Sequence, residues 1–127
     1  MGYYRPFDYS QLLQYIASKS SATYYSKTTT SSGATKTYSF AKPSDDSKWL
    51  MFVYANADDS DSESWIRIEY ADDNESHPIA VCRGGNGEIG VWACGIVDKI
   101  KYFKATYHNA SASSKYLYTA YTRIKFE

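Results

Sequence analysis

The sequence predicts one mainly β domain, an antiparallel β-sandwich of jelly-roll type or a barrel, with about seven or eight strands and one short N-terminal helix. From Ala22 onward, short runs of Tyr, Thr, Val, Ile, Phe and Trp are separated by Ser, Asp, Asn and Gly, which is the pattern of strands and turns. These runs are regularly spaced. A chain of 127 residues without an internal repeat, a long linker or a charge block fits a single domain, 1–127.

The N-terminal part of the chain differs from the rest. We expect an aromatic arm over residues 1–7 and a helix over residues 8–19, followed by the β domain over residues 22–127. Asp8 can cap the helix, and Gln11 can complete a capping box. Apolar residues then recur at helical spacing, at Leu12, Leu13 and Ile16. Because so short a helix is marginal alone, it must pack on the sheet or on another subunit.

Short β-rich runs mark the strands in chain order. The predicted strands are 23–30, 35–40, 48–54, 64–70, 78–83, 88–93, 96–107 and 115–126. Turn residues between them predict three hairpins, around Ser31-Ser32-Gly33, around Gly84-Gly85-Asn86-Gly87 and through residues 108–114.

Alternation along two strands predicts which side chains face the core. In residues 65–70, Ile66, Ile68 and Tyr70 share the apolar face, which indicates an antiparallel sheet with one solvent-exposed face. In the last strand, the set that begins with Tyr116 and Tyr118 and ends with Phe126 is predicted to point inward.

Charge and cysteine content say little about a partner. Fourteen Lys and Arg balance fourteen Asp and Glu, so no net field attracts nucleic acid or an anionic membrane. Around the glycine turn, Cys82 and Cys94 would point to opposite faces, so we expect two reduced thiols and no disulfide. The apolar runs are too short to cross a membrane, and the N-terminus lacks the pattern of a signal peptide. We therefore expect synthesis in the cytoplasm without a signal peptide.

Catalytic motifs are not visible in the sequence. His77 and His108 lack a recognisable partner, and no nucleophile elbow or HExxH segment occurs. We therefore expect no enzyme, no cofactor and no metal. A small hydrolase that pairs Glu69 with Glu88 or Asp98 stays a minor alternative, because spacing neither supports nor opposes it.

Two loops and one basic region resemble ligand sites only in part. The acidic loop 58–63 has oxygen ligands at alternate positions, but it lacks the rest of an EF-hand, so a solvated turn is favoured and cation binding stays open. The loop 83–88 is followed by a strand instead of the helix that a phosphate site needs. In the basic region that includes Lys99, Lys101 and Lys104, the first two alternate with Ile100 and Tyr102 as on a solvated strand, so no nucleic acid is expected.

Aromatic content is the strongest departure from an ordinary composition. The chain has fourteen Tyr and three Trp, and such side chains are favoured both in sheets and in interfaces. This small, neutral, Tyr-rich β domain is similar in style to structural proteins of bacteriophage particles, such as tail, fibre or capsid-decorating modules. The resemblance implies a non-catalytic assembly protein, incorporated in a virion, that oligomerises or docks on partner subunits. Its predicted contacts in the arm are Tyr3, Tyr4, Arg5 and Phe7.

Carbohydrate binding is the alternative function. In that case Trp65, Trp92 or surface tyrosines would stack on sugar rings.

Overall fold

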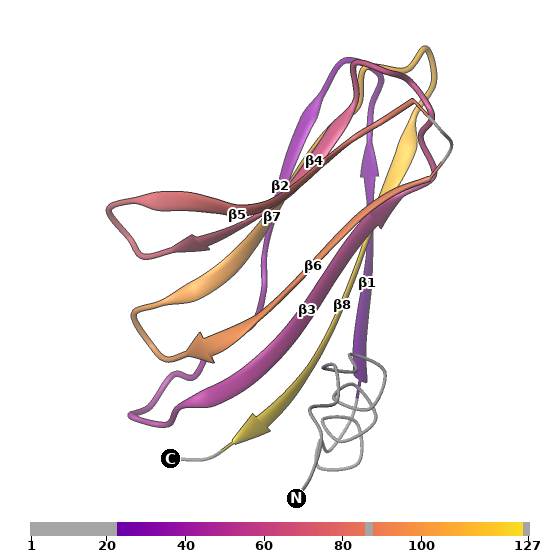
Figure 1. Ribbon diagram of the computed structural model, residues 1–127. Coiled ribbons are helices and arrows are strands. Elements are labelled where there is room, and N and C mark those ends of the chain that lie inside the picture. The colour runs from indigo at the N-terminus through magenta and orange to yellow at the C-terminus, as the bar shows by residue number, and fades with distance from the viewer. Residues whose placement is uncertain (1–22, 86–87, 126–127) are drawn as a thin grey trace, which may run out of the picture.

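The computed structural model describes residues 23–85 and 88–125, which form strands and connecting loops and contain no helix. Eight strands lie in two antiparallel four-stranded sheets that face each other (Figure 1). Their bounds are β1 Thr23–Thr30, β2 Thr35–Ser39, β3 Trp49–Ala57, β4 Trp65–Ala71, β5 Ser76–Arg83, β6 Ile89–Val97, β7 Tyr102–His108 and β8 Lys115–Lys125. The mainly β prediction is confirmed. The predicted arm and helix lie outside the described residues.

Strand order shows how the chain is wound. Sheet A has the order β1-β8-β3-β6, and sheet B has the order β2-β7-β4-β5. Consecutive strands lie in different sheets everywhere except at β4 and β5, which form a hairpin. The pairs β4–β5, β3–β6, β2–β7 and β1–β8 are therefore nested, so the first half of the described chain runs antiparallel to the second half.

All three predicted hairpins are wrong. β1 and β2, β5 and β6, and β7 and β8 lie in different sheets, so each connection passes from one layer of the sandwich to the other. Turn residues specify that the chain reverses, but they do not specify that the flanking strands hydrogen-bond to each other. Cys82 and Cys94 are both free, and they lie in different sheets.

The predicted strand 96–107 is in fact the end of β6, a turn and β7. The turn is fixed by Asp98, whose Oδ1 accepts hydrogen bonds from the amides of Ile100 at 2.8 Å and Lys101 at 2.7 Å. These hydrogen bonds lower the pKa of Asp98. A local side-chain bond to the backbone thus replaces strand pairing where alternation alone indicated a continuous strand.

The core lies between the two sheets. Met51, Val53, Ala55 and Ala57 of β3 are fully buried and alternate with residues on the outer side. Ile66 and Ile68 of β4 are also fully buried, as predicted. Sheet B contributes the largest buried side chains, Phe103 and Tyr107.

The prediction for β8 is wrong. Leu117 is fully buried and Thr119 is 4% exposed, whereas Tyr116 is 43% and Tyr118 is 37% exposed. Both faces of this strand carry large apolar or aromatic groups, so the alternation alone does not identify the inner face. Tyrosine is tolerated at a surface because its hydroxyl remains in water, and leucine has no such group.

Buried polar groups tie the loops to the sandwich. Asp59 is almost fully buried and accepts a hydrogen bond from the hydroxyl of Tyr107. Burial acts to raise the pKa of Asp59, but hydrogen bonds from Ser64, Tyr107 and the amide of Asp61 outweigh burial and lower it. The buried Asn109 donates to the carbonyls of Thr30 and Ser113, each at 2.9 Å.

The two faces of β8 can be compared by mutation. We expect Leu117→Ala to lower the free energy of unfolding by about 2–5 kcal/mol, because it leaves a cavity in the core. Tyr118→Ala should lower it by less than about 1 kcal/mol, because the ring lies outside the core. Urea denaturation measures the free energy of unfolding of both variants. Equal losses would mean that the inner face of β8 is misassigned.

Acid stability should depend on Asp72, in the β4–β5 turn. This carboxylate accepts hydrogen bonds from the Lys101 ammonium at 2.9 Å and from the amides of Asn74 at 2.8 Å and Glu75 at 2.9 Å, which lower its pKa from the usual 3.8 to about 2. The stabilisation is therefore present above the unfolded pKa and is lost as the pH falls toward 2.

We expect Asp72→Asn to be less stable than the wild type at pH 7, with the difference shrinking between about pH 4 and pH 2. Urea midpoints across this range measure the effect. Asp73→Asn is the matched control, because Asp73 is exposed beside it in the same turn. A difference that is the same at all pH values would contradict this role of the carboxylate.

Candidate functional site

The outer side of sheet A carries a concentration of aromatic side chains. Register places Trp92 beside Tyr54 and Tyr54 beside Ala120, which in turn pairs with Tyr25, so these residues form one row across four strands. We call this surface the aromatic face; its members are Tyr25, Phe52, Tyr54, Trp92, Tyr116 and Tyr118. They lie outside because their neighbours along each strand fill the core.

At one end of the aromatic face the rings pack on each other. Phe52 and Trp92 stack with ring centroids 5.3 Å apart and an angle of 14° between their planes. A Cβ atom at Gly90 would lie 2.7 Å from the hydroxyl of Tyr54, so a glycine is needed there for Tyr54 to lie across β6. Tyr54 and Trp92 remain 39% and 43% exposed, so this end presents packed rings that a partner can still contact. Tyr25 lies at the opposite edge of the sheet, in β1, and is 79% exposed.

At the other end a cation lies over the rings. The Lys27 ammonium is 4.0 Å from the centre of the Tyr116 ring and 6.0 Å from that of Tyr118. The two tyrosine rings lie 5.9 Å apart. Cation–π contacts of this kind hold exposed rings in place with little loss of accessible area.

A polar pair borders the aromatic face. The amide of Asn56 donates a hydrogen bond to the carboxylate of Glu88. Burial and this nearby carboxylate raise the pKa of Tyr54. Amide and carboxylate groups beside an open ring can bind hydroxyl groups of a ligand.

The outer side of sheet B has the opposite character. The carboxylate of Glu69 forms an ion pair with Arg67 at 2.8 Å and accepts a hydrogen bond from Thr106 at 3.0 Å. In the next row, Thr35 and His108 are hydrogen-bonded at 2.9 Å. This side is held together by polar contacts, although Val81, which lies opposite Arg67, is 58% exposed.

The two predicted ligand-binding tryptophans lie on different sheets. Trp92 belongs to the aromatic face, whereas Trp65 is on the outer side of sheet B. Trp65 stacks on His108 with centroids 5.8 Å apart, and the Arg67 guanidinium lies 4.8 Å from its ring centre. The two rings therefore cannot form one platform. The predicted arm contacts Tyr3, Tyr4, Arg5 and Phe7 lie outside the described residues.

The structure does not bring the candidate catalytic residues together. Glu69 is on the outer side of sheet B, and Glu88 borders the aromatic face. Asp98 accepts hydrogen bonds from the backbone of the turn that follows β6. His77 contacts Glu75 at 3.2 Å at the start of β5, and His108 ends β7. Residues 23–85 and 88–125 contain no group of three or more His, Cys, Asp or Glu that could hold a metal ion.

The acidic loop 58–63 uses two of its carboxylates internally. Asp59 accepts a hydrogen bond from the amide of Asp61 at 2.9 Å, and Asp61 accepts one from the amide of Glu63 at 2.9 Å. Such bonds to the amide two residues ahead are Asx turns, which stabilise the loop itself.

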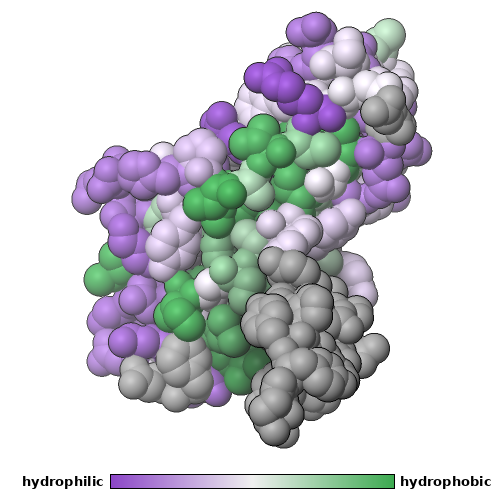
Figure 2. Space-filling model, in the orientation of Figure 1, coloured by the Kyte–Doolittle hydropathy of each residue, from purple (hydrophilic) through white to green (hydrophobic). Residues whose placement is uncertain are grey.

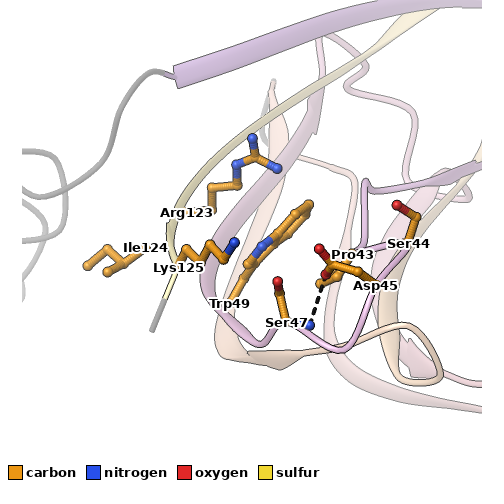
Figure 3. A pocket seen from close by; sticks show the side chains of 8 residues that line it. All are labelled: Pro43, Ser44, Asp45, Ser47, Trp49, Arg123, Ile124 and Lys125. Atoms are coloured by element: carbon orange, nitrogen blue, oxygen red, sulfur yellow. Dashed lines mark hydrogen bonds between the residues drawn. The ribbon is translucent and has the colours of Figure 1, made fainter. Parts of the chain in front are cut away.

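A pocket of about 460 Å³ lies where β3 begins and β8 ends. Figure 3 shows Trp49 at its centre, with Arg123 and Lys125 on one side and the loop that contains Asp45 and Ser47 on the other. The Arg123 guanidinium is 4.0 Å from the Trp49 ring centre and so covers one face of the indole. Hydrogen bonds from Ser47 lower the pKa of Asp45. The pocket mixes both charges and shows no arrangement for catalysis.

Sequence analysis missed most of the aromatic face and this pocket. The signal for Phe52 and Tyr54 was their alternation with Met51 and Val53 in a single run. Because every residue of that run is apolar or aromatic, the alternation showed only once the core was known. Trp49 and Arg123 are distant in sequence and meet only through the pairing of β3 with β8.

The chain matches no protein-family model, and no curated protein is significantly similar to it in sequence. The described residues include no helix that is long and apolar enough to cross a membrane.

Proposed function

We propose that this protein is a non-catalytic assembly module that binds partner protein subunits through the aromatic face of sheet A. The observation that carries the proposal is the contrast between the two outer surfaces. Sheet A presents open aromatic rings, with Tyr25 79% exposed, whereas the outer side of sheet B carries polar contacts such as those of Glu69 with Arg67 and Thr106. Tyr and Trp supply large, rigid contact area at low entropic cost, and they dominate the binding energy of many interfaces.

The strand order supports a more specific proposal. The nested pairs β1–β8, β2–β7, β3–β6 and β4–β5, divided between two sheets, favour a jelly roll as the form of the sandwich. Jelly-roll domains occur in viral capsids and in lectins. Together with the compositional resemblance, this favours a bacteriophage virion protein of the tail, fibre or capsid surface. In this proposal the arm residues Tyr3, Tyr4, Arg5 and Phe7 contribute to the contact with neighbouring subunits.

The first test places a charge on the aromatic face. We expect Tyr118→Glu to weaken association of the full-length chain at least tenfold, about 1.4 kcal/mol, because a carboxylate replaces a ring at the interface. Sedimentation velocity over a concentration series measures this. Deletion of residues 1–7 should weaken association in the same assay.

The matched control is Ser39→Glu on sheet B. Each new glutamate lies opposite a lysine, Lys27 for Tyr118→Glu and Lys104 for Ser39→Glu, so both variants keep a favourable cross-strand pair. We expect Ser39→Glu to associate like the wild type. If both variants match the wild type, the aromatic face is not the contact surface.

Carbohydrate binding is the second candidate, favoured by the Asn56–Glu88 pair beside Tyr54 and Trp92. Aromatic rings next to amide and carboxylate groups suit the apolar face and hydroxyls of a sugar.

If the chain binds glycans, a glycan array should show binding that Trp92→Ala abolishes and Trp65→Ala retains, because the Trp65 ring is already covered by His108 and Arg67. No binding by the wild type, or equal loss in both variants, would exclude this candidate.

A further inference from the structure

The two sheets end in four edge strands, β1 and β6 in sheet A and β2 and β5 in sheet B. Edge strands are usually protected against pairing with another chain by charges, proline or bulges. Lys27 lies in β1 and Lys36 in β2. β5 contains Pro78 and Arg83, and its pairing with β4 is irregular next to Ile68. Three of the four edges thus carry protection.

β6 carries none of these features. Its nine residues, IGVWACGIV, include no charge and no proline. It is paired with β3 on one side, and no other strand of the described chain pairs with it; the carbonyl of Ile96 accepts a hydrogen bond from the Tyr70 hydroxyl at 2.6 Å. Trp92 and Ile96 are each 43% exposed. A long, uncharged edge strand of this kind is a template for pairing with another chain.

The surface next to β6 is also apolar. A pocket of about 330 Å³ lies on this side of the sandwich, and Ile79 from β5 and Ile96 from β6 both line it. Ile79 is 50% exposed. Figure 2 shows apolar residues gathered in the middle of the visible face, between hydrophilic residues on the β4–β5 side and at the upper end. Contact here would remove apolar area from water.

We propose that β6 pairs with β6 of a second copy of this chain, antiparallel and across a two-fold axis, so that the two A sheets become one continuous sheet. The inference rests on the proposed assembly function and names its partner and interface. Antiparallel pairing of a strand with itself is two-fold symmetric, and it therefore closes a dimer instead of leading to a fibre. An edge without charge best matches another edge without charge.

Symmetry restricts the register. A two-fold axis through one residue pairs residues that are both even-numbered or both odd-numbered, and whose side chains therefore point to the same face of the sheet. The inner faces of the two sheets then align, and the two aromatic faces lie on the same side. With the axis at Ala93, Glu88 would lie opposite Asp98 of the second copy, which places like charges together. With the axis at Cys94, Trp92 lies opposite Ile96 of the second copy, an aromatic and β-branched pair that stabilises sheets. We therefore centre the interface on Cys94.

The interface is small. A strand of nine residues is about 31 Å long, so pairing through one edge buries an area at the low end of protein interfaces. The dimer is accordingly reversible, and the full assembly needs further contacts from the aromatic face.

The test uses the two natural cysteines of the full-length chain. In the Cys82→Ser variant, oxidation should cross-link two copies through Cys94, and Cys94→Ser should abolish the cross-link. Burial raises the pKa of the Cys94 thiol, so the oxidation is run at mildly alkaline pH. This readout needs no change within β6, so it does not depend on whether a β6 variant folds.

A second readout measures association by sedimentation velocity. We expect Ile96→Lys to raise the dissociation constant at least tenfold, because a lysine in an edge strand opposes pairing with another chain and the branched partner of Trp92 is lost. Ile100→Lys is the matched control, because Ile100 is 58% exposed in the turn beyond β6, and it should associate like the wild type. Circular dichroism confirms that both variants fold.

The outcomes separate this inference from the proposed function. Association that survives Ile96→Lys but is broken by Tyr118→Glu overturns the β6 interface and supports the aromatic face. Association broken by Ile96→Lys alone supports the β6 interface and counts against the aromatic face. A chain that stays monomeric and does not cross-link overturns the β6 dimer, and a β6-dependent dimer without the Cys94 cross-link overturns its register.

Discussion

The β4–β5 hairpin is the constraint from which the other strand pairings follow. Asp72 fixes the turn through the amides of Asn74 and Glu75 and an ion pair with Lys101. Because the chain reverses there, the segments on either side of the turn run antiparallel, and the pairs β3–β6, β2–β7 and β1–β8 are nested around the hairpin. Because successive pairs alternate between the sheets, every strand has one face toward the core and one toward the outside.

The two outer surfaces differ in chemistry because the strands contribute different residues to them. In β3, small and branched side chains such as Val53 and Ala55 fill the core, which leaves Phe52 and Tyr54 outside. In β4, Arg67 and Glu69 face outward and form an ion pair. Glu69 also accepts a hydrogen bond from Thr106 and is almost fully buried. One surface engages many of its polar groups in contacts with each other, while the other exposes rings, and covering apolar rings is favourable. That asymmetry connects the packing of the sandwich to the proposed binding role.

Strand positions could be predicted from the sequence, but strand partners could not. The runs 23–30 and 115–126 nearly coincide with β1 and β8, because β-branched and aromatic residues favour strands locally. That these two strands pair depends on a long-range arrangement that no local turn encodes. The facing of β8 was misjudged because Leu117 and Tyr118 are both compatible with a core. Without strand partners, Trp65 and Trp92 could not be placed on different sheets in advance. The aromatic face could be recognised only once the strand pairing and the inward or outward direction of each side chain were known.

Edge pairing and the aromatic face strengthen each other in the proposed assembly. Joining two copies through β6 would place both aromatic faces on one side of an extended sheet, because a two-fold axis through Cys94 pairs only residues of equal parity. A partner subunit that contacts the row of Tyr25, Tyr54 and Trp92 in one copy would then meet the same row in the other. Two weak contacts held in one rigid sheet bind more tightly than either alone, because the second contact becomes intramolecular. A small β6 interface is therefore sufficient in an assembly, although it would be marginal for an isolated dimer.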